Sequence, residues 1–161
     1  MGDKVRVLFV DDEEDFLHYM AKRLNMRDLE VLAFTNAVEA LDTTEGQTFD
    51  VALLDLKMPE MDGEVLLQKL KERDPRVEVI ILTGHGNIQS AFSTSRYGAY
   101  EYLLKPCDFE QLVMAISNAY AKRIEALEEN KASRVRELIE HAQNMTGLGL
   151  LQQLKKIRED S

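Results

Sequence analysis

Three short apolar runs in this chain each end in charged side chains suited to phosphate or metal chemistry. Asp11 and Asp12 follow the first run, at residues 5–10. Asp55 follows the second run, at residues 49–54, and Lys105 follows the third, at residues 102–104. Clustered carboxylates repel one another unless a cation neutralises them, and Mg²⁺ prefers such oxygen ligands. Provided that the runs end at one place, the pattern predicts a joint site for a divalent cation and an anion.

The segments that carry these residues are predicted to be strands of one parallel sheet. The apolar runs are short and are separated by segments of helix length, as in parallel sheets covered on both faces. The carboxyl ends of such strands share one edge of the sheet, where α/β proteins place their ligand sites. We therefore expect a doubly wound α/β domain with a five-stranded parallel sheet and a helix after each strand. The expected strands are residues 5–10, 29–34, 49–55, 77–83 and 100–105, and the expected helices are residues 13–26, 36–46, 63–73, 88–97 and 108 onward.

Bulk composition limits the partners and the location that we expect. The 161 residues are 45% apolar and 30% charged, which suits one main core with an appendage. The net charge of −9 is concentrated in residues 1–120, where 22 acidic side chains face 12 basic ones. Non-specific binding to nucleic acid or to an anionic membrane is therefore not expected. Cys107 is the single cysteine, which excludes an internal disulfide and is typical of a cytoplasmic protein.

Four motifs occur in the order found in one known family. They are Val10-Asp11-Asp12-Glu13, Asp55-Leu56-Lys57-Met58-Pro59-Glu60-Met61-Asp62-Gly63, Leu82-Thr83-Gly84, and Gly98-Ala99-Tyr100-Glu101-Tyr102-Leu103-Leu104-Lys105-Pro106. Over residues 4–122 the chain resembles the receiver domain of response regulators from two-component signal transduction systems, which has a flavodoxin-like fold. The segment 82–86 is similar to receivers of nitrogen-regulator-type transcription activators.

The resemblance implies a phosphorylation site at the end of the second run. Asp55 would be the phosphoacceptor, attacking the phosphoryl group of a phosphohistidine or of a small phosphodonor. Lys105 and Thr83 would contact other phosphoryl oxygens and complete the catalytic set. The Lys105-Pro106 bond would be cis, as in the family, and would aim Lys105 inward. The protein would catalyse only its own phosphorylation and dephosphorylation and would not otherwise be an enzyme.

The same resemblance implies Mg²⁺ as the cofactor. Asp12 would bind the ion directly, Asp11 directly or through water, and Asp55 would share it. The backbone carbonyl of Lys57 would supply a further ligand. Each residue alone has a simpler explanation, since Asp11 and Asp12 could cap a helix and Asp55 could cap a loop. Their joint position at strand ends favours the cation site.

Switching and its rate are expected to depend on residues around the site. By resemblance, Thr83 and Tyr102 would form the switch, with the tyrosine ring moving between solvent and a partly buried slot. A static, half-buried Tyr102 is the simpler alternative. Lys57 and His85 would admit or exclude attacking water and so set the lifetime of the phosphorylated state.

Residues 123–161 are predicted to be a helical extension beyond a receiver domain of residues 1–122. The apolar stripe of the last receiver helix continues to residue 145, although Asn130, Lys131 and Ser133 interrupt it. The pattern breaks over residues 145–149, and a last short amphipathic helix follows. Three arrangements stay open: the extension folds back on the receiver, forms a dimer, or docks a partner.

Three functions fit these observations. The first is a stand-alone receiver that takes phosphate from a sensor histidine kinase or a phosphotransfer protein and then binds an output partner that the sequence does not name. A homodimer would form through the extension or through the face made by residues 88–105 and the helix that follows. The second function is the receiver fragment of a longer transcription activator. The third is an aspartate-nucleophile phosphatase of the dehalogenase type, but that class expects an aspartate where Lys57 stands.

Overall fold

The protein folds around a parallel sheet of five strands. This computed structural model describes residues 4–84, 98–142 and 146–160. The strands are β1 Val5–Val10, β2 Leu29–Phe34, β3 Val51–Leu54, β4 Glu78–Thr83 and β5 Glu101–Leu104. All neighbouring strands run parallel, in the order β2-β1-β3-β4-β5. The predicted five-stranded parallel sheet is confirmed.

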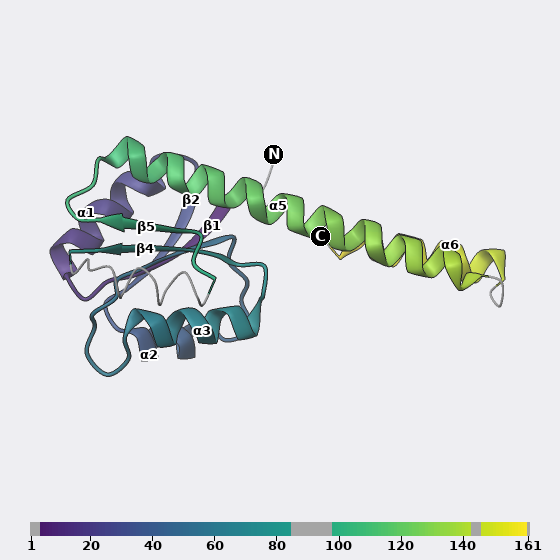
Figure 1. Cartoon of the computed structure of the whole chain (residues 1–161), viewed down its shortest axis with the longest axis horizontal. Coiled ribbons are helices and arrows are strands. Elements are labelled where there is room, and N and C mark those ends of the chain that lie inside the picture. Colours follow the sequence, from purple (N-terminus) through teal and green to yellow (C-terminus); the bar gives the residue numbers. More distant parts are fainter. Residues whose placement is uncertain (1–3, 85–97, 143–145, 161) are drawn as a thin grey trace. The chain divides into compact units, whose positions relative to one another are not determined.

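Helices cover both faces of the sheet, as the doubly wound pattern predicts (Figure 1). They are α1 Glu14–Asn25, α2 Ala37–Thr43, α3 Gly63–Arg73, α5 Phe109–Glu140 and α6 Gly147–Glu159. The helices α1 and α5 cover one face of the sheet, and α2 and α3 cover the other. The helix expected at residues 88–97 lies outside the described residues.

The core has two layers because successive strand side chains point to opposite faces of the sheet. On β1, Val7 and Phe9 pack with α1 and the first turns of α5. Leu8 and Val10 pack with α2 and α3 on the other side. All four side chains are fully buried. The middle strands therefore have no exposed face, and polar chemistry is confined to the strand ends.

Three strands are shorter than the sequence predicts, and one of them, β4, differs only in beginning at Glu78 rather than at residue 77. The strand β3 begins at Val51 rather than at residue 49, and the Asp50 carboxylate accepts a hydrogen bond of 2.8 Å from the backbone amide of Arg6. A side chain thus replaces a strand carbonyl as the acceptor at that position. The strand β5 is Glu101–Leu104 and ends just before Lys105. The strands β3 and β5 still end next to the predicted charged residues Asp55 and Lys105.

The chain divides into two compact units, residues 1–121 and residues 122–161. This division lies within one residue of the predicted boundary, and the assignment of two independent domains stays a prediction. The helix α5 runs without a break from the first unit into the second, so the polar interruption of its apolar stripe does not end the helix. None of the described helices is long and apolar enough to cross a membrane.

The second unit consists of the later part of α5 and the helix α6. Arg134 of α5 pairs with Asp160 just after α6, at 3.2 Å. A shallow hollow between the two helices is lined by Leu138 and Ile157, among others. The helix α6 begins at Gly147, inside the segment where the sequence predicted a break, because the Thr146 hydroxyl caps it by accepting a hydrogen bond from the Gly149 amide.

Candidate functional site

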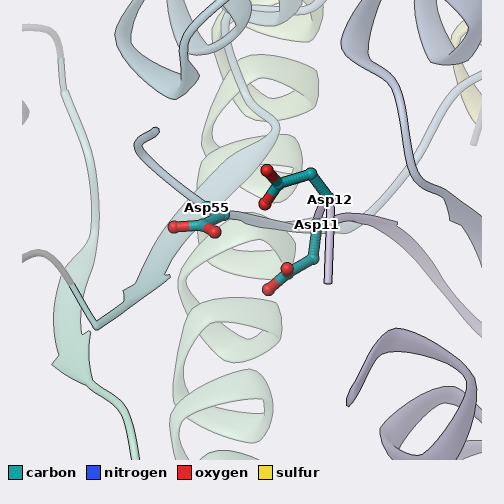
Figure 2. Close-up of side chains that lie close together, drawn as sticks. All are labelled: Asp11, Asp12 and Asp55. Carbon is teal, nitrogen blue, oxygen red and sulfur yellow. The ribbon is translucent and has the colours of Figure 1, made fainter. Parts of the chain in front are cut away.

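Three carboxylates meet at the carboxyl edge of the sheet. Asp11 and Asp12 follow β1, and Asp55 follows β3, the neighbouring strand. One oxygen from each carboxylate lies within 4.8 Å of the others. Figure 2 shows the three side chains close together, with Asp11 and Asp12 turned to different sides of their backbone and Asp55 coming from a separate segment. Asp11 and Asp55 are buried and Asp12 is exposed, so the cluster is open to solvent on the Asp12 side.

Backbone hydrogen bonds beyond the strand ends hold these carboxylates in place. The Asp11 amide donates to the Phe34 carbonyl, and the Asp55 amide donates to the Val10 carbonyl, each at 3.0 Å. The Asp11 carboxylate in turn accepts a 2.9 Å hydrogen bond from the Glu13 amide. The sheet therefore fixes the backbone of both buried aspartates, and the start of α1 fixes the Asp11 side chain.

The start of α3 packs directly on the backbone of Asp55. A Cβ atom at Gly63 would lie 2.2 Å from the Asp55 carbonyl oxygen, closer than any side chain allows. The Gly63 amide donates a 2.7 Å hydrogen bond to the Leu56 carbonyl. Asp62 caps α3 by accepting from the Val65 amide. The loop after Asp55 is thereby closed against the helix, and this contact requires glycine.

Lys105 reaches into the cluster from the end of β5. Its Nζ lies 2.6 Å from Asp11 Oδ2, 3.0 Å from Glu13 Oε1 and 3.6 Å from Asp55 Oδ2. Its ammonium also sits 4.3 Å from the centre of the Phe16 ring, a favourable position for a cation. The Lys105-Pro106 bond is cis, as expected. The lysine amide donates to the Thr83 carbonyl at 2.9 Å, which ties β5 to the end of β4.

The electrostatic balance of the site favours a further cation. Burial raises the pKa of Asp11 above its ordinary value of 3.8, although Lys105 acts to lower it. Burial alone would lower the pKa of Lys105, but the contacts with Asp11 and Glu13 outweigh burial and raise it. One ammonium thus faces several carboxylates, and a negative excess remains.

The donor set suits Mg²⁺. The buried Oδ1 atom of Asp55 has no hydrogen-bond partner within the described part of the chain. Buried polar atoms are rarely left unpaired, and an unpaired one calls for an ion or another partner that completes it. The clustered oxygens are hard ligands, and one side of the cluster is open, as a partly hydrated Mg²⁺ requires.

Of the four other predicted site residues, the structure describes three. Thr83 is fully buried at the end of β4. Tyr102 of β5 is half-buried against the core layer of α2 and α3. Lys57 is exposed in the loop two residues after Asp55. His85 lies outside the described residues.

The sequence motifs and this geometry match one family. The sequence model of the response regulator receiver domain matches residues 7–117, which is more than half of the chain. The chain belongs to the response regulator receiver family. The resemblance predicted from the four motifs is therefore confirmed.

Relatives of this receiver include transcription regulators of the nitrogen-regulator type. The DNA-binding transcriptional regulator NtrC of Escherichia coli K12 is 36% identical over 113 residues, which cover 70% of this chain and 24% of NtrC. The C4-dicarboxylate transport transcriptional regulatory protein DctD of Rhizobium meliloti is 32% identical over 131 residues, which cover 81% of this chain and 28% of DctD. The chain thus spans about a quarter of the length of the curated relatives it matches.

Solved structures show the same receiver fold. A response regulator receiver domain protein from Clostridium thermocellum is 35% identical, with a TM-score of 0.71 over 76% of this chain and 98% of that chain. NtrX from Brucella abortus, solved in complex with ADP, is 27% identical, with a TM-score of 0.75 over 86% of this chain and 34% of NtrX. The receiver fold predicted from the sequence is confirmed.

Sequence reasoning missed three residues around the cluster: Glu13, Phe16 and Gly63. Glu13 stood inside the first motif, but nothing in the sequence shows that its side chain turns toward Lys105. Phe16 carries no signal in the sequence beyond its apolar character. Gly63 ends the second motif, and the structure places it against the Asp55 backbone. A glycine at the first position of a helix, where it is not a favoured residue, was the available signal.

Proposed function

We propose that this receiver accepts a phosphoryl group on Asp55 and that phosphorylation changes its affinity for a partner. The supporting observation is the position of Asp55, a buried carboxylate beside two more carboxylates and 3.6 Å from Lys105, whose Oδ1 has no hydrogen-bond partner among the described residues. A carboxylate oxygen in this position can act as the nucleophile in phosphoryl transfer.

The proposed transfer is a displacement at phosphorus. A carboxylate oxygen of Asp55 forms a bond to phosphorus while the bond from phosphorus to the donor's histidine nitrogen breaks, and the electron pair stays on that nitrogen. Lys105 pairs with one phosphoryl oxygen and Thr83 donates a hydrogen bond to another, so the transferred charge is stabilised. Attack of water on phosphorus later restores the Asp55 carboxylate and releases inorganic phosphate.

Mg²⁺ is the proposed cofactor of both steps. Asp11, Asp12, Asp55 and the backbone carbonyl of Lys57 would hold it. When bound, the ion supplies positive charge that offsets the repulsion between the aspartates and an incoming phosphoryl group. Lys57 and His85 are proposed to set the lifetime of the phosphorylated state through the access of water.

The proposed partners follow from the family. A sensor histidine kinase or a phosphotransfer protein would donate the phosphoryl group. Thr83 and Tyr102 would transmit its arrival to the surface of β5, and an output partner or a second copy of the receiver would respond.

A second candidate function is the receiver part of a longer transcription activator. The chain spans about a quarter of NtrC and DctD, the regulators that it resembles. In that case the helical unit of residues 122–161 would connect the receiver to further domains. The chemistry proposed for Asp55 is the same in both cases.

Intact mass spectrometry tests the proposed chemistry. The protein would be incubated with Mg²⁺ and acetyl phosphate, and Asp55→Asn is the matched control, since it keeps the size of the side chain. We expect the wild type to gain the mass of one phosphoryl group and the variant to gain none. A gain in both proteins would place the acceptor elsewhere, and no gain in either, with Mg²⁺ and donor in excess, would count against the proposal.

A further inference from the structure

Of the three described carboxylates that form ion pairs with Lys105, Glu13 is the one that is not among the proposed metal ligands. Its Oε1 accepts a hydrogen bond of 3.0 Å from Lys105 Nζ. The same Nζ lies farther from the phosphoacceptor, at 3.6 Å from Asp55 Oδ2. The lysine ammonium is thus shared between the proposed phosphorylation site and a carboxylate outside it.

The local structure of Glu13 leaves its side chain available for this contact. Glu13 occupies the N-cap position of α1, yet its side chain caps no backbone amide of the helix. Its own amide is already used, because it donates to Asp11 Oδ1. The side chain is 58% exposed, whereas that of Lys105 is 10% exposed. Glu13 can therefore release the lysine and return to water at little cost.

Asp11 and Glu13 hold Lys105 in different ways. Asp11 is fully buried and is fixed by its backbone hydrogen bond to the Phe34 carbonyl, so it stays beside the lysine in any state of the site. Glu13 is exposed. The ammonium lies 3.6 Å from Asp55 Oδ2 and 3.0 Å from Glu13 Oε1, so Glu13 and a phosphoryl group on Asp55 would compete for the same donor.

We propose that Glu13 is a positioning residue that competes with the phosphoryl group for Lys105. It holds the lysine in the unphosphorylated protein and weakens the site's affinity for a phosphoryl group or its analogue. This inference rests on the proposed function of Asp55. Exposed ion pairs contribute little, so the competition should change the affinity by about 3–10-fold.

Two substitutions separate the contact from the charge. Glu13→Gln removes the charge and keeps the length of the side chain. Glu13→Asp keeps the charge but is one methylene shorter, which takes the carboxylate out of reach of Lys105. Glu14→Gln is the matched control, because Glu14 is the next residue, is exposed and has the same charge.

Beryllofluoride, a phosphoryl analogue, is the probe, and its Kd is measured by calorimetry at saturating Mg²⁺. We expect Glu13→Gln and Glu13→Asp to bind it about 3–10-fold more tightly than the wild type, whereas Glu14→Gln changes the Kd less than about two-fold. The affinity for Mg²⁺ alone should change no more in the Glu13 variants than in Glu14→Gln. If Glu13 affected only folding, its substitution would not change the affinity for beryllofluoride while leaving the affinity for Mg²⁺ unchanged.

Three other outcomes would overturn the inference. An unchanged beryllofluoride affinity in both Glu13 variants would show that Glu13 does not compete for Lys105. If Glu13→Gln and Glu14→Gln bound beryllofluoride equally more tightly and Glu13→Asp bound it like the wild type, the effect would be one of net charge and not of the contact with Lys105. A wild type that neither binds beryllofluoride nor gains phosphoryl mass would instead overturn the proposed function, and this inference with it.

Discussion

At the scale of single residues, the cost of burying Asp11 determines a pH dependence of stability. Burial raises its pKa in the folded chain above the ordinary value of 3.8, so the folded state binds the proton more tightly than the unfolded state. The contribution of Asp11 to the unfolding free energy is greatest below pH 3.8 and is lost as the pH rises through the raised pKa of the folded state. Without Mg²⁺, Asp11→Asn should therefore lose less stability than the wild type between pH 4 and neutrality.

Chemical denaturation in a chelator at several pH values measures this difference. Asp15→Asn is the control, because Asp15 is an exposed acid in the first turn of α1. The same slope of stability against pH in Asp11→Asn and in the wild type would show that burial of this carboxyl has no net cost.

A second prediction at the scale of single residues concerns Asp12, which is the exposed member of the carboxylate cluster. Its carboxylate contributes repulsion without Mg²⁺ and a ligand with it. We expect Asp12→Ala to be at least as stable as the wild type in a chelator and to lose most of the stabilisation that Mg²⁺ gives the wild type. Thermal denaturation with and without Mg²⁺ measures both effects, and an undiminished stabilisation by Mg²⁺ would exclude Asp12 as a ligand.

The sequence predicts the residues of the cluster better than their contacts. Asp11, Asp12, Asp55 and Lys105 are found together because strand ends in a parallel sheet share one edge. The contact between Glu13 and Lys105 could not be predicted, since a carboxylate at a helix N-cap normally accepts from the helix amides. Its choice of partner depends on where β5 ends, which is a property of the folded sheet.

At the scale of elements, the contact between α3 and the Asp55 backbone predicts a large loss of stability when Gly63 is substituted. A Cβ at Gly63 would lie 2.2 Å from the Asp55 carbonyl oxygen, so Gly63→Ala must push the helix and the loop apart. We expect a loss of about 2–3 kcal/mol of unfolding free energy, as for overpacked cores. The displaced Asp55 should also be phosphorylated more slowly.

Gly147→Ala is the matched control for this substitution. Gly147 also begins a helix, α6, and a Cβ there meets no described atom within 4 Å. Alanine has a higher helix propensity than glycine, so this variant should gain roughly 0.5 kcal/mol of unfolding free energy. Denaturant unfolding of both variants measures the difference, and equal stability would contradict the close approach at Gly63.

Element types were easier to predict from the sequence than element ends. The caps of α2 and α3 were readable, because Asn36 and Asp62 are typical N-cap residues and each accepts a hydrogen bond from a backbone amide three residues later. The start of α6 was misplaced, because its two glycines resembled a break. The Thr146 cap decides that start, and a hydroxyl cap is a weaker sequence signal than a pair of glycines.

At the scale of the whole molecule, the described α5 residues that are buried in the receiver's hydrophobic core all belong to the first unit. The α5 residues buried in that core are Phe109, Leu112, Ala115, Ile116 and Ala119, all of which precede the end of the first unit. The later stretch of α5 and the helix α6 bury little apolar surface of their own, and Ile139, Leu148 and Leu151 are exposed. The stability of the receiver should therefore be nearly independent of the second unit.

A chain that ends at residue 122 tests this independence. We expect it to fold cooperatively, to gain one phosphoryl group from acetyl phosphate with Mg²⁺, and to lose that group at the rate of the full chain, because all the proposed site residues lie before residue 106. Unfolding curves and intact mass over time measure the three properties. A slower or faster loss of phosphate with an unchanged unfolding midpoint would mean that the extension acts on the phosphorylated state, and a failure to fold would make α5 beyond residue 122 part of the receiver itself.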